Sequence, residues 1–130
     1  MYRLAITRDF IARHFLIGGD WGAENHEHSH HYKVQVLLRG EALDRHGYLA
    51  DIVDLEAALE EAIARFRDRT LNELPPFADL NPSLERFARV LYEDLRERPA
   101  LQGLGLEVKL WENERDWAAY GEPGPGRADR

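Results

Sequence analysis

Hydrophobic and polar residues alternate in four stretches of the chain, which is the pattern of strands with one buried face. The first stretch starts at Tyr2 and continues past Phe10, and the second covers residues 32–39. A third strand is predicted around 106–110 and a fourth at 117–120. The apolar rows of these strands are expected to share the inner face of one sheet.

Two segments between the second and third strands instead repeat apolar residues at helical spacing. Asp51 is a good N-cap for a helix with a buried face formed by Ile52, Leu55, Leu59, Ile63 and Phe66. After a loop at 72–79, Asn81 is expected to cap a second helix with Pro82 at its first position. The buried stripe of that helix is Leu84, Phe87, Ala88, Leu91 and Leu95.

This order of elements predicts an α+β fold. Four strands form an antiparallel sheet, and the two helices are inserted between strands 2 and 3 and pack on one face. Residues 1–120 are expected to be a single domain, and 121–130, rich in Gly and Pro, a disordered tail. A small open sheet leaves edges that must be covered or paired, so we expect a homo-oligomer with sheets joined across subunits.

Composition narrows the choice of partners. The chain has 130 residues with 17 basic and 24 acidic side chains, a formal net charge of −7. This charge argues against a nucleic-acid partner, because such binding depends on phosphate neutralisation. We find neither a signal-peptide core nor an apolar run of membrane-spanning length, so we expect a cytoplasmic protein that binds small molecules. The chain has no cysteine, which excludes a thiolate metal site and disulfides.

The candidate chemistry lies in three histidines. His28 and His30 are two apart, in phase with the apolar row of the second strand, whereas His31 has the opposite parity and should face water. His14, on the preceding segment, is the natural third ligand. Three protein ligands leave a fourth tetrahedral position open, as in catalytic zinc sites. The alternative is a polar, His-rich loop without a metal. A cupin does not fit, because the Glu expected after the pair is absent and two helices interrupt the barrel.

Several short motifs resemble the family of 6-pyruvoyl- and 6-carboxy-tetrahydropterin synthases over roughly residues 2–120. Phe10–His14 is similar to its F-x-A-x-H, and His28–Tyr32 to its H-G-H-x-Y. The other matches are Gly47–Asp51 with G-x-x-x-D, Leu71–Asn72 with the end of L-D-H-x-x-L-N, Asn81–Glu85 with N-P-T-x-E, and Trp111–Glu112 with Trp117 and Tyr120 with V-x-E-T-x-x-x-x-A-x-Y.

The resemblance implies a tunnelling-type fold that oligomerises into a barrel, a hexamer of two stacked trimers, with sites between subunits. It implies that His14, His28 and His30 bind Zn²⁺ and that Glu112 anchors the pterin ring. The residues agree for Glu112, which continues the inward parity of Leu110 and would be costly to bury without a partner offering N–H donors. The alternative is a salt bridge to a nearby Arg. Ser83, at a helix N-terminus, either donates to the ring or is only a first-turn residue.

Two departures from the family affect the chemistry. Glu24 stands at the place of the usual catalytic Cys, and Arg67 and Asp68 at the place of its Asp-His pair. A subgroup with Glu at the Cys position cleaves the side chain of 7,8-dihydroneopterin triphosphate. The resulting hypothesis is a zinc-dependent lyase in which Glu24 is the general base and Asp68 a proton shuttle, while Arg67 or Arg69 meets the triphosphate.

Each of these residues also has an alternative. Glu24 can be an exposed loop residue, Asp68 a helix-end residue, and the arginines partners of the helix dipole. The second functional hypothesis is a pterin- or purine-binding homologue that has lost or changed the ancestral synthase activity. A purely structural metal site is the third.

Overall fold

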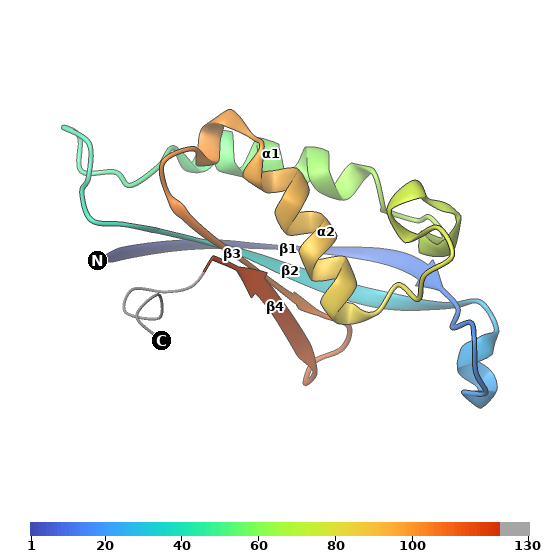
Figure 1. Ribbon diagram of the computed structural model, residues 1–130. Helices are drawn as coiled ribbons and strands as arrows, with labels where there is room; N and C mark the ends of the chain where they lie inside the picture. The colour runs from blue at the N-terminus through green and yellow to red at the C-terminus, as the bar shows by residue number, and fades with distance from the viewer. Residues whose placement is uncertain (123–130) are drawn as a thin grey trace.

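The computed structural model of the chain describes residues 1–122, in which one sheet carries both helices on a single face (Figure 1). The strands are β1 (Tyr2–His14), β2 (His28–Gly40), β3 (Gly105–Trp111) and β4 (Trp117–Gly121), and the helices are α1 (Ile52–Ala64) and α2 (Leu84–Arg96). Short 3₁₀ turns are η1 (Gly22–Asn25), η2 (Leu71–Glu73), η3 (Pro75–Phe77) and η4 (Pro99–Leu101). The predicted α+β fold is therefore confirmed.

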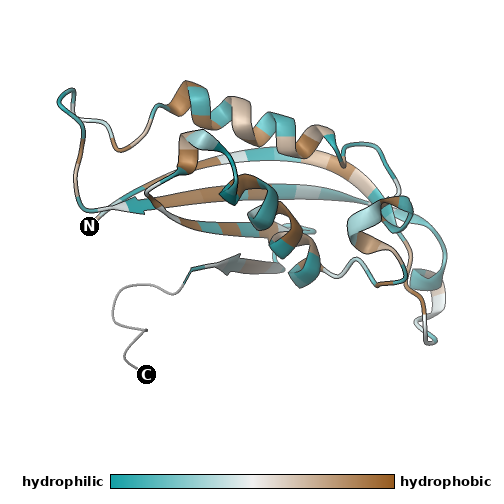
Figure 2. Cartoon of the chain, turned by 45° about the horizontal axis from the view of Figure 1, so that its top comes forward, coloured by the Kyte–Doolittle hydropathy of each residue, from teal (hydrophilic) through white to brown (hydrophobic). Residues whose placement is uncertain are grey.

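The sheet has the strand order β1-β2-β3-β4, and all neighbours are antiparallel. Even-numbered residues of the first three strands share the face beneath the helices, because the register pairs Phe10 with Tyr32 and Val34 with Leu110. The core forms between this face and the helices, where Val34, Leu59 and Phe87 are fully buried. Figure 2 shows the hydrophobic positions along these elements.

The two helices begin at different kinds of cap. Asp51 caps α1 as predicted, because its side chain accepts a hydrogen bond from the Val53 N–H at 2.9 Å. The prediction of Asn81 as the cap of α2 is wrong. Ser83 holds that place and accepts from the Arg86 N–H at 3.1 Å. Asn81 instead bonds with both backbone groups of Ile17, a long-range contact that local patterns do not reveal. Ile52, predicted to be buried, is 43% exposed because it lies in the first turn of α1.

β1 and β2 extend well beyond their neighbours at one end of the sheet (Figure 1). β3 pairs with β2 only from Lys33 onward, so within residues 1–122 the stretch His28–Tyr32 has no sheet partner on that side. On the other side the outer edge of β1 is covered near its end by the 68–70 segment, where the Arg13 N–H donates to the Arg69 carbonyl at 2.8 Å. The overhanging ends of β1 and β2 therefore form a separate platform, and it carries the three histidines.

β4 ends in a polar clamp. Gly121, predicted to be in the tail, closes β4, and the Glu122 carboxylate accepts hydrogen bonds from Tyr92, from Arg96 at 2.9 Å and from the Leu106 N–H at 2.9 Å. Burial raises the pKa of Glu122, but these hydrogen bonds and the Arg96 charge outweigh it and hold the pKa below 4.5. The rest of the predicted disordered tail, 123–130, lies outside the described residues. Within 1–122, neither helix is long and apolar enough to cross a membrane.

Candidate metal centre

The three histidines meet on the helix-covered face of the β1–β2 platform. His14 lies directly opposite His28, and His30 lies opposite Ala12, whose small side chain leaves room for the rings. The ring centroids are 4.6 Å apart for His14 and His28, 4.7 Å for His14 and His30, and 5.0 Å for His28 and His30. The antiparallel register thus brings together the residues that the sequence separates by the 15–27 loop. His31 faces solvent as predicted, with 67% of its side chain exposed.

Glu24 completes the cluster. It lies in η1, and its Oε2 is 2.6 Å from Nε2 of His28. One ligand atom from each of His14, Glu24, His28 and His30 can be chosen so that all four lie within 4.8 Å of one another. Imidazole nitrogen and carboxylate oxygen are the donors that zinc takes in cysteine-free sites. The residues present therefore fit a zinc ion.

The histidines are prepared to bind as neutral ligands. Burial, followed by the nearby His30 and His28, lowers the pKa of His14 to about 4, so the ring is uncharged near neutral pH. Nδ1 of His28 lies 2.8 Å from the His26 carbonyl, which places the ring proton on Nδ1 and leaves Nε2 free for a metal. Such contacts behind metal ligands fix the ring orientation and tautomer.

Tyr32 supports His14 from beneath. Its ring is 1% exposed, and its hydroxyl lies 3.3 Å from Nδ1 of His14. Burial raises the pKa of Tyr32, and the negative charges of Glu112 and Glu24 raise it further, so the phenol stays protonated. The same ring packs on Phe10 and Phe87, at centroid distances of 5.4 and 5.2 Å. The aromatic core is thereby continuous with the candidate centre.

Glu112 follows β3 immediately, in phase with the buried row that ends at Leu110. Extending the β2–β3 register by one pair places it beside Tyr32, which agrees with the effect of its charge on that residue. Glu112 is half-buried and lines a hollow of about 450 Å³ together with Asp9, His31, Lys33, Asn113 and Glu114. It stands near the histidines and also reaches a space able to hold part of a small molecule.

The remaining predicted site residues lie outside the cluster. The Ser83 hydroxyl oxygen is occupied as the α2 cap acceptor, which leaves its O–H to donate. Arg67 pairs with Glu60 at 3.2 Å. Asp68 has a positive φ of 60°, and its backbone N–H donates to the Ile11 carbonyl at 2.6 Å. For Arg67 and Asp68, the structure shows a charged surface pair and a turn.

Three asparagines missed at the sequence level fix the loop that carries Glu24. The Asn72 amide bonds with both backbone groups of Phe15 at 2.9 Å, and Asn81 does the same for Ile17. Asn25 binds the carbonyls of Leu16 and Gly19 and the Trp21 N–H. Side-chain amides here replace the ladder of a sheet, so only the residue type was visible beforehand.

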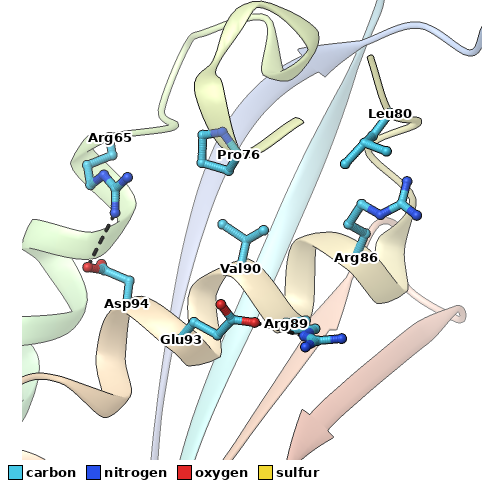
Figure 3. Close-up of a pocket in the computed structure, with 8 residues that line it drawn as sticks. All are labelled: Arg65, Pro76, Leu80, Arg86, Arg89, Val90, Glu93 and Asp94. Atoms are coloured by element: carbon cyan, nitrogen blue, oxygen red, sulfur yellow. Dashed lines mark hydrogen bonds and ion pairs between the residues drawn. The ribbon is translucent and has the colours of Figure 1, made fainter. Parts of the chain in front are cut away.

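A separate hollow of about 440 Å³ lies on the outer side of α2 (Figure 3). Its lining consists of Arg65, Pro76, Leu80, Arg86, Arg89, Val90, Glu93 and Asp94. The charges in it are largely paired, since Arg65 lies 3.3 Å from Asp94 and Arg89 lies 2.8 Å from Glu93. None of its residues belongs to the histidine cluster, so this hollow does not compete with the platform as the candidate site.

The sequence profile of the 6-pyruvoyl tetrahydropterin synthase family matches residues 3–123. The chain belongs to this family. It is 32% identical over 95 residues to the 6-pyruvoyl tetrahydrobiopterin synthase of Pongo abelii, an alignment that covers 72% of this chain and 65% of that enzyme. The match thus spans slightly less than two thirds of the relative's length.

Solved structures share the family fold. The Caenorhabditis elegans 6-pyruvoyl tetrahydropterin synthase superposes with a TM-score of 0.80 at 21% identity, covering 94% of this chain and 96% of the other. A Plasmodium vivax 6-pyruvoyltetrahydropterin synthase, with its catalytic glutamate replaced by alanine, gives a TM-score of 0.74 at 16% identity and covers 95% and 98%. These similarities support the same arrangement of sheet and helices.

Proposed function

We propose that this protein is a zinc-dependent lyase that acts on the side chain of a dihydropterin, with 7,8-dihydroneopterin triphosphate as the first substrate to test. The observation that carries the proposal is the cluster of His14, His28 and His30 with the Glu24 carboxylate in the same space. Membership of a family named for tetrahydropterin synthesis supports the substrate class.

Zinc held by the three histidines supplies a Lewis acid that stabilises negative charge on a substrate oxygen. Glu24 takes a proton from the side chain as general base, since its carboxylate is already directed at the place where that side chain would lie. A catalytic glutamate in the Plasmodium vivax synthase supports this role for a carboxylate in the family.

The pterin ring is held at the other side of the site. Glu112 accepts two N–H bonds from the guanidine-like edge of the ring, and such a paired arrangement offsets the cost of its partial burial. Ser83 donates its free O–H to the ring. Arg67 is proposed to meet the triphosphate and Asp68 to shuttle a proton, and both roles require the substrate to extend from the cluster to the 67–68 turn.

The oligomer proposed with this function is a hexamer of two stacked trimers with sites between subunits. The unpaired side of His28–Tyr32 in residues 1–122 supports it, because a neighbouring subunit could cover the platform there. Sedimentation of the purified protein measures the assembly directly.

The test is incubation of the zinc-loaded protein with 7,8-dihydroneopterin triphosphate, with products separated by chromatography and identified by mass spectrometry. We expect a new pterin together with triphosphate or a cleaved side chain. Glu24→Gln should abolish turnover while the protein still binds zinc, and full activity in that variant would exclude the base role.

The second candidate is a pterin-binding homologue without synthase activity. The placement of Arg67 in a surface ion pair and of Asp68 in a turn favours it, because the family has an Asp-His pair there. Unchanged substrate with a full complement of zinc, combined with measurable binding of 7,8-dihydroneopterin by calorimetry, would support this candidate against the lyase.

A further inference from the structure

The contact between Glu24 and His28 is too close to be ignored and has the wrong direction for a hydrogen bond. Oε2 of Glu24 lies 2.6 Å from Nε2 of His28. That nitrogen is buried and has no hydrogen-bond partner anywhere in residues 1–122. The ring proton is on Nδ1, which faces the His26 carbonyl at 2.8 Å. A nitrogen lone pair and a carboxylate oxygen therefore lie side by side, an arrangement that a shared cation stabilises.

The position of Glu24 is set by its backbone. The Leu16 N–H donates to the Glu24 carbonyl at 2.9 Å, which ties η1 to the segment two residues beyond His14. The Asn25 side chain binds Leu16 as well, at 3.0 Å. The carboxylate is thus presented to the histidines by a segment with its own hydrogen bonds, as expected for a metal ligand.

The other carboxylate of the loop is directed elsewhere. Glu27 accepts a hydrogen bond from the Thr70 hydroxyl, and Thr70 is only 7% exposed. Glu27 is absent from the group of ligand atoms that lie within 4.8 Å of one another, whereas Glu24 belongs to it. Two glutamates three positions apart therefore have different functions, and only one of them faces the candidate centre.

We infer that Glu24 is a fourth protein ligand of the metal in the substrate-free protein and leaves that position when a substrate brings its own donor. Three histidines and one carboxylate complete the tetrahedral set that zinc takes in closed sites. While Glu24 binds the metal it cannot accept a proton. Its release by the substrate then frees the general base beside the side chain it acts on. This inference rests on the proposed function, since it requires a metal at the histidines.

The experiment uses Co²⁺, whose visible absorption reports the number and geometry of its ligands, in place of zinc. The variants are Glu24→Gln and Glu24→Ala, with Glu27→Gln as the matched control on the same loop. We expect the wild-type protein and the control to give the same four-coordinate spectrum without substrate. Both Glu24 variants should give a different spectrum and bind zinc about tenfold more weakly, or worse, in competition with a chromophoric chelator.

Addition of 7,8-dihydroneopterin tests the release. The wild-type spectrum should change on titration, whereas the Glu24→Ala protein, which lacks the carboxylate from the start, should show no loss of a protein ligand. Identical cobalt spectra and zinc affinities in the wild type and both Glu24 variants would overturn the inference and leave the histidine site and the lyase proposal intact. A wild-type protein that binds no metal would overturn both. Circular dichroism of each variant verifies that it is folded.

Discussion

Replacement of Phe87 by alanine should weaken both the core and the metal centre. Phe87 is fully buried, and its ring packs against Phe10, Tyr32, Phe66 and Phe77 at centroid distances of 5.8, 5.2, 5.2 and 5.6 Å. A Phe→Ala change in a core costs about 3–5 kcal/mol, and each lost aromatic pair adds about 0.5–1.5 kcal/mol beyond burial. The four partners come from β1, β2, the end of α1 and η3, so they cannot all move into the cavity.

We therefore expect a loss near the upper end, about 4–5 kcal/mol, in the free energy of unfolding measured by urea denaturation of the metal-free protein. A domain of this size has about 6–18 kcal/mol of stability, so the variant should still fold. Phe87→Leu, which retains most of the apolar volume, should lose about 1–2 kcal/mol.

The effect on the metal follows from Tyr32, which rests on Phe87 and contacts Nδ1 of His14 at 3.3 Å. With the cavity beneath it, Tyr32 should move, and zinc affinity measured by calorimetry should fall about tenfold. Leu95→Ala is the control, because Leu95 is fully buried on the same helix, about 12 Å from Phe87 along the axis. Unchanged zinc affinity in Phe87→Ala, or an equal fall in Leu95→Ala, would refute the coupling of core and site.

Three further outcomes test individual contacts. Tyr32→Phe should weaken zinc binding about tenfold by removing the hydroxyl near His14, and calorimetry showing wild-type affinity would contradict the supporting role. Because the pKa of Glu122 is lowered on folding, its stabilisation is present above pH 4.5 and is lost as the pH falls through the folded value. Urea curves of the wild type and Glu122→Gln should therefore differ at pH 7 and converge in acid, and a constant difference would contradict this. Asn72→Ala removes both 2.9 Å bonds to Phe15 and should cost about 1–3 kcal/mol, so an unchanged urea midpoint would show that the loop is held elsewhere.

The sequence predicted the strands and the three histidines because both depend on parity. Alternation along β1 and β2 decides which side chains face the helices, and His28 and His30 follow the same alternation as Val34. The proximity of His14 required more, since a 13-residue connection separates β1 from β2 and such a loop does not set a register. The pairing of His14 with His28 is a property of the folded sheet.

The errors arose where long-range polar contacts replaced local rules. Asn81 has the composition of a helix cap, yet its amide is used by Ile17, 64 residues away, and Ser83 takes over the cap. The function of Glu24 could be guessed only from its place in a motif. Its contact with His28 depends on η1 and on the Asn25 bonds, which no periodicity reveals.

The unequal lengths of the strands explain why the site lies where it does. Along most of the sheet the inner face is sealed by α1 and α2, and polar side chains there would be costly to bury. Past Lys33, however, β2 leaves its pairing with β3, while Tyr32 still belongs to the aromatic core. The next inward positions, His30 and His28, therefore stand on rigid strand backbone at the edge of the packed interior. A metal ligand needs both conditions, since fixed backbone sets its geometry and incomplete cover leaves room for a substrate.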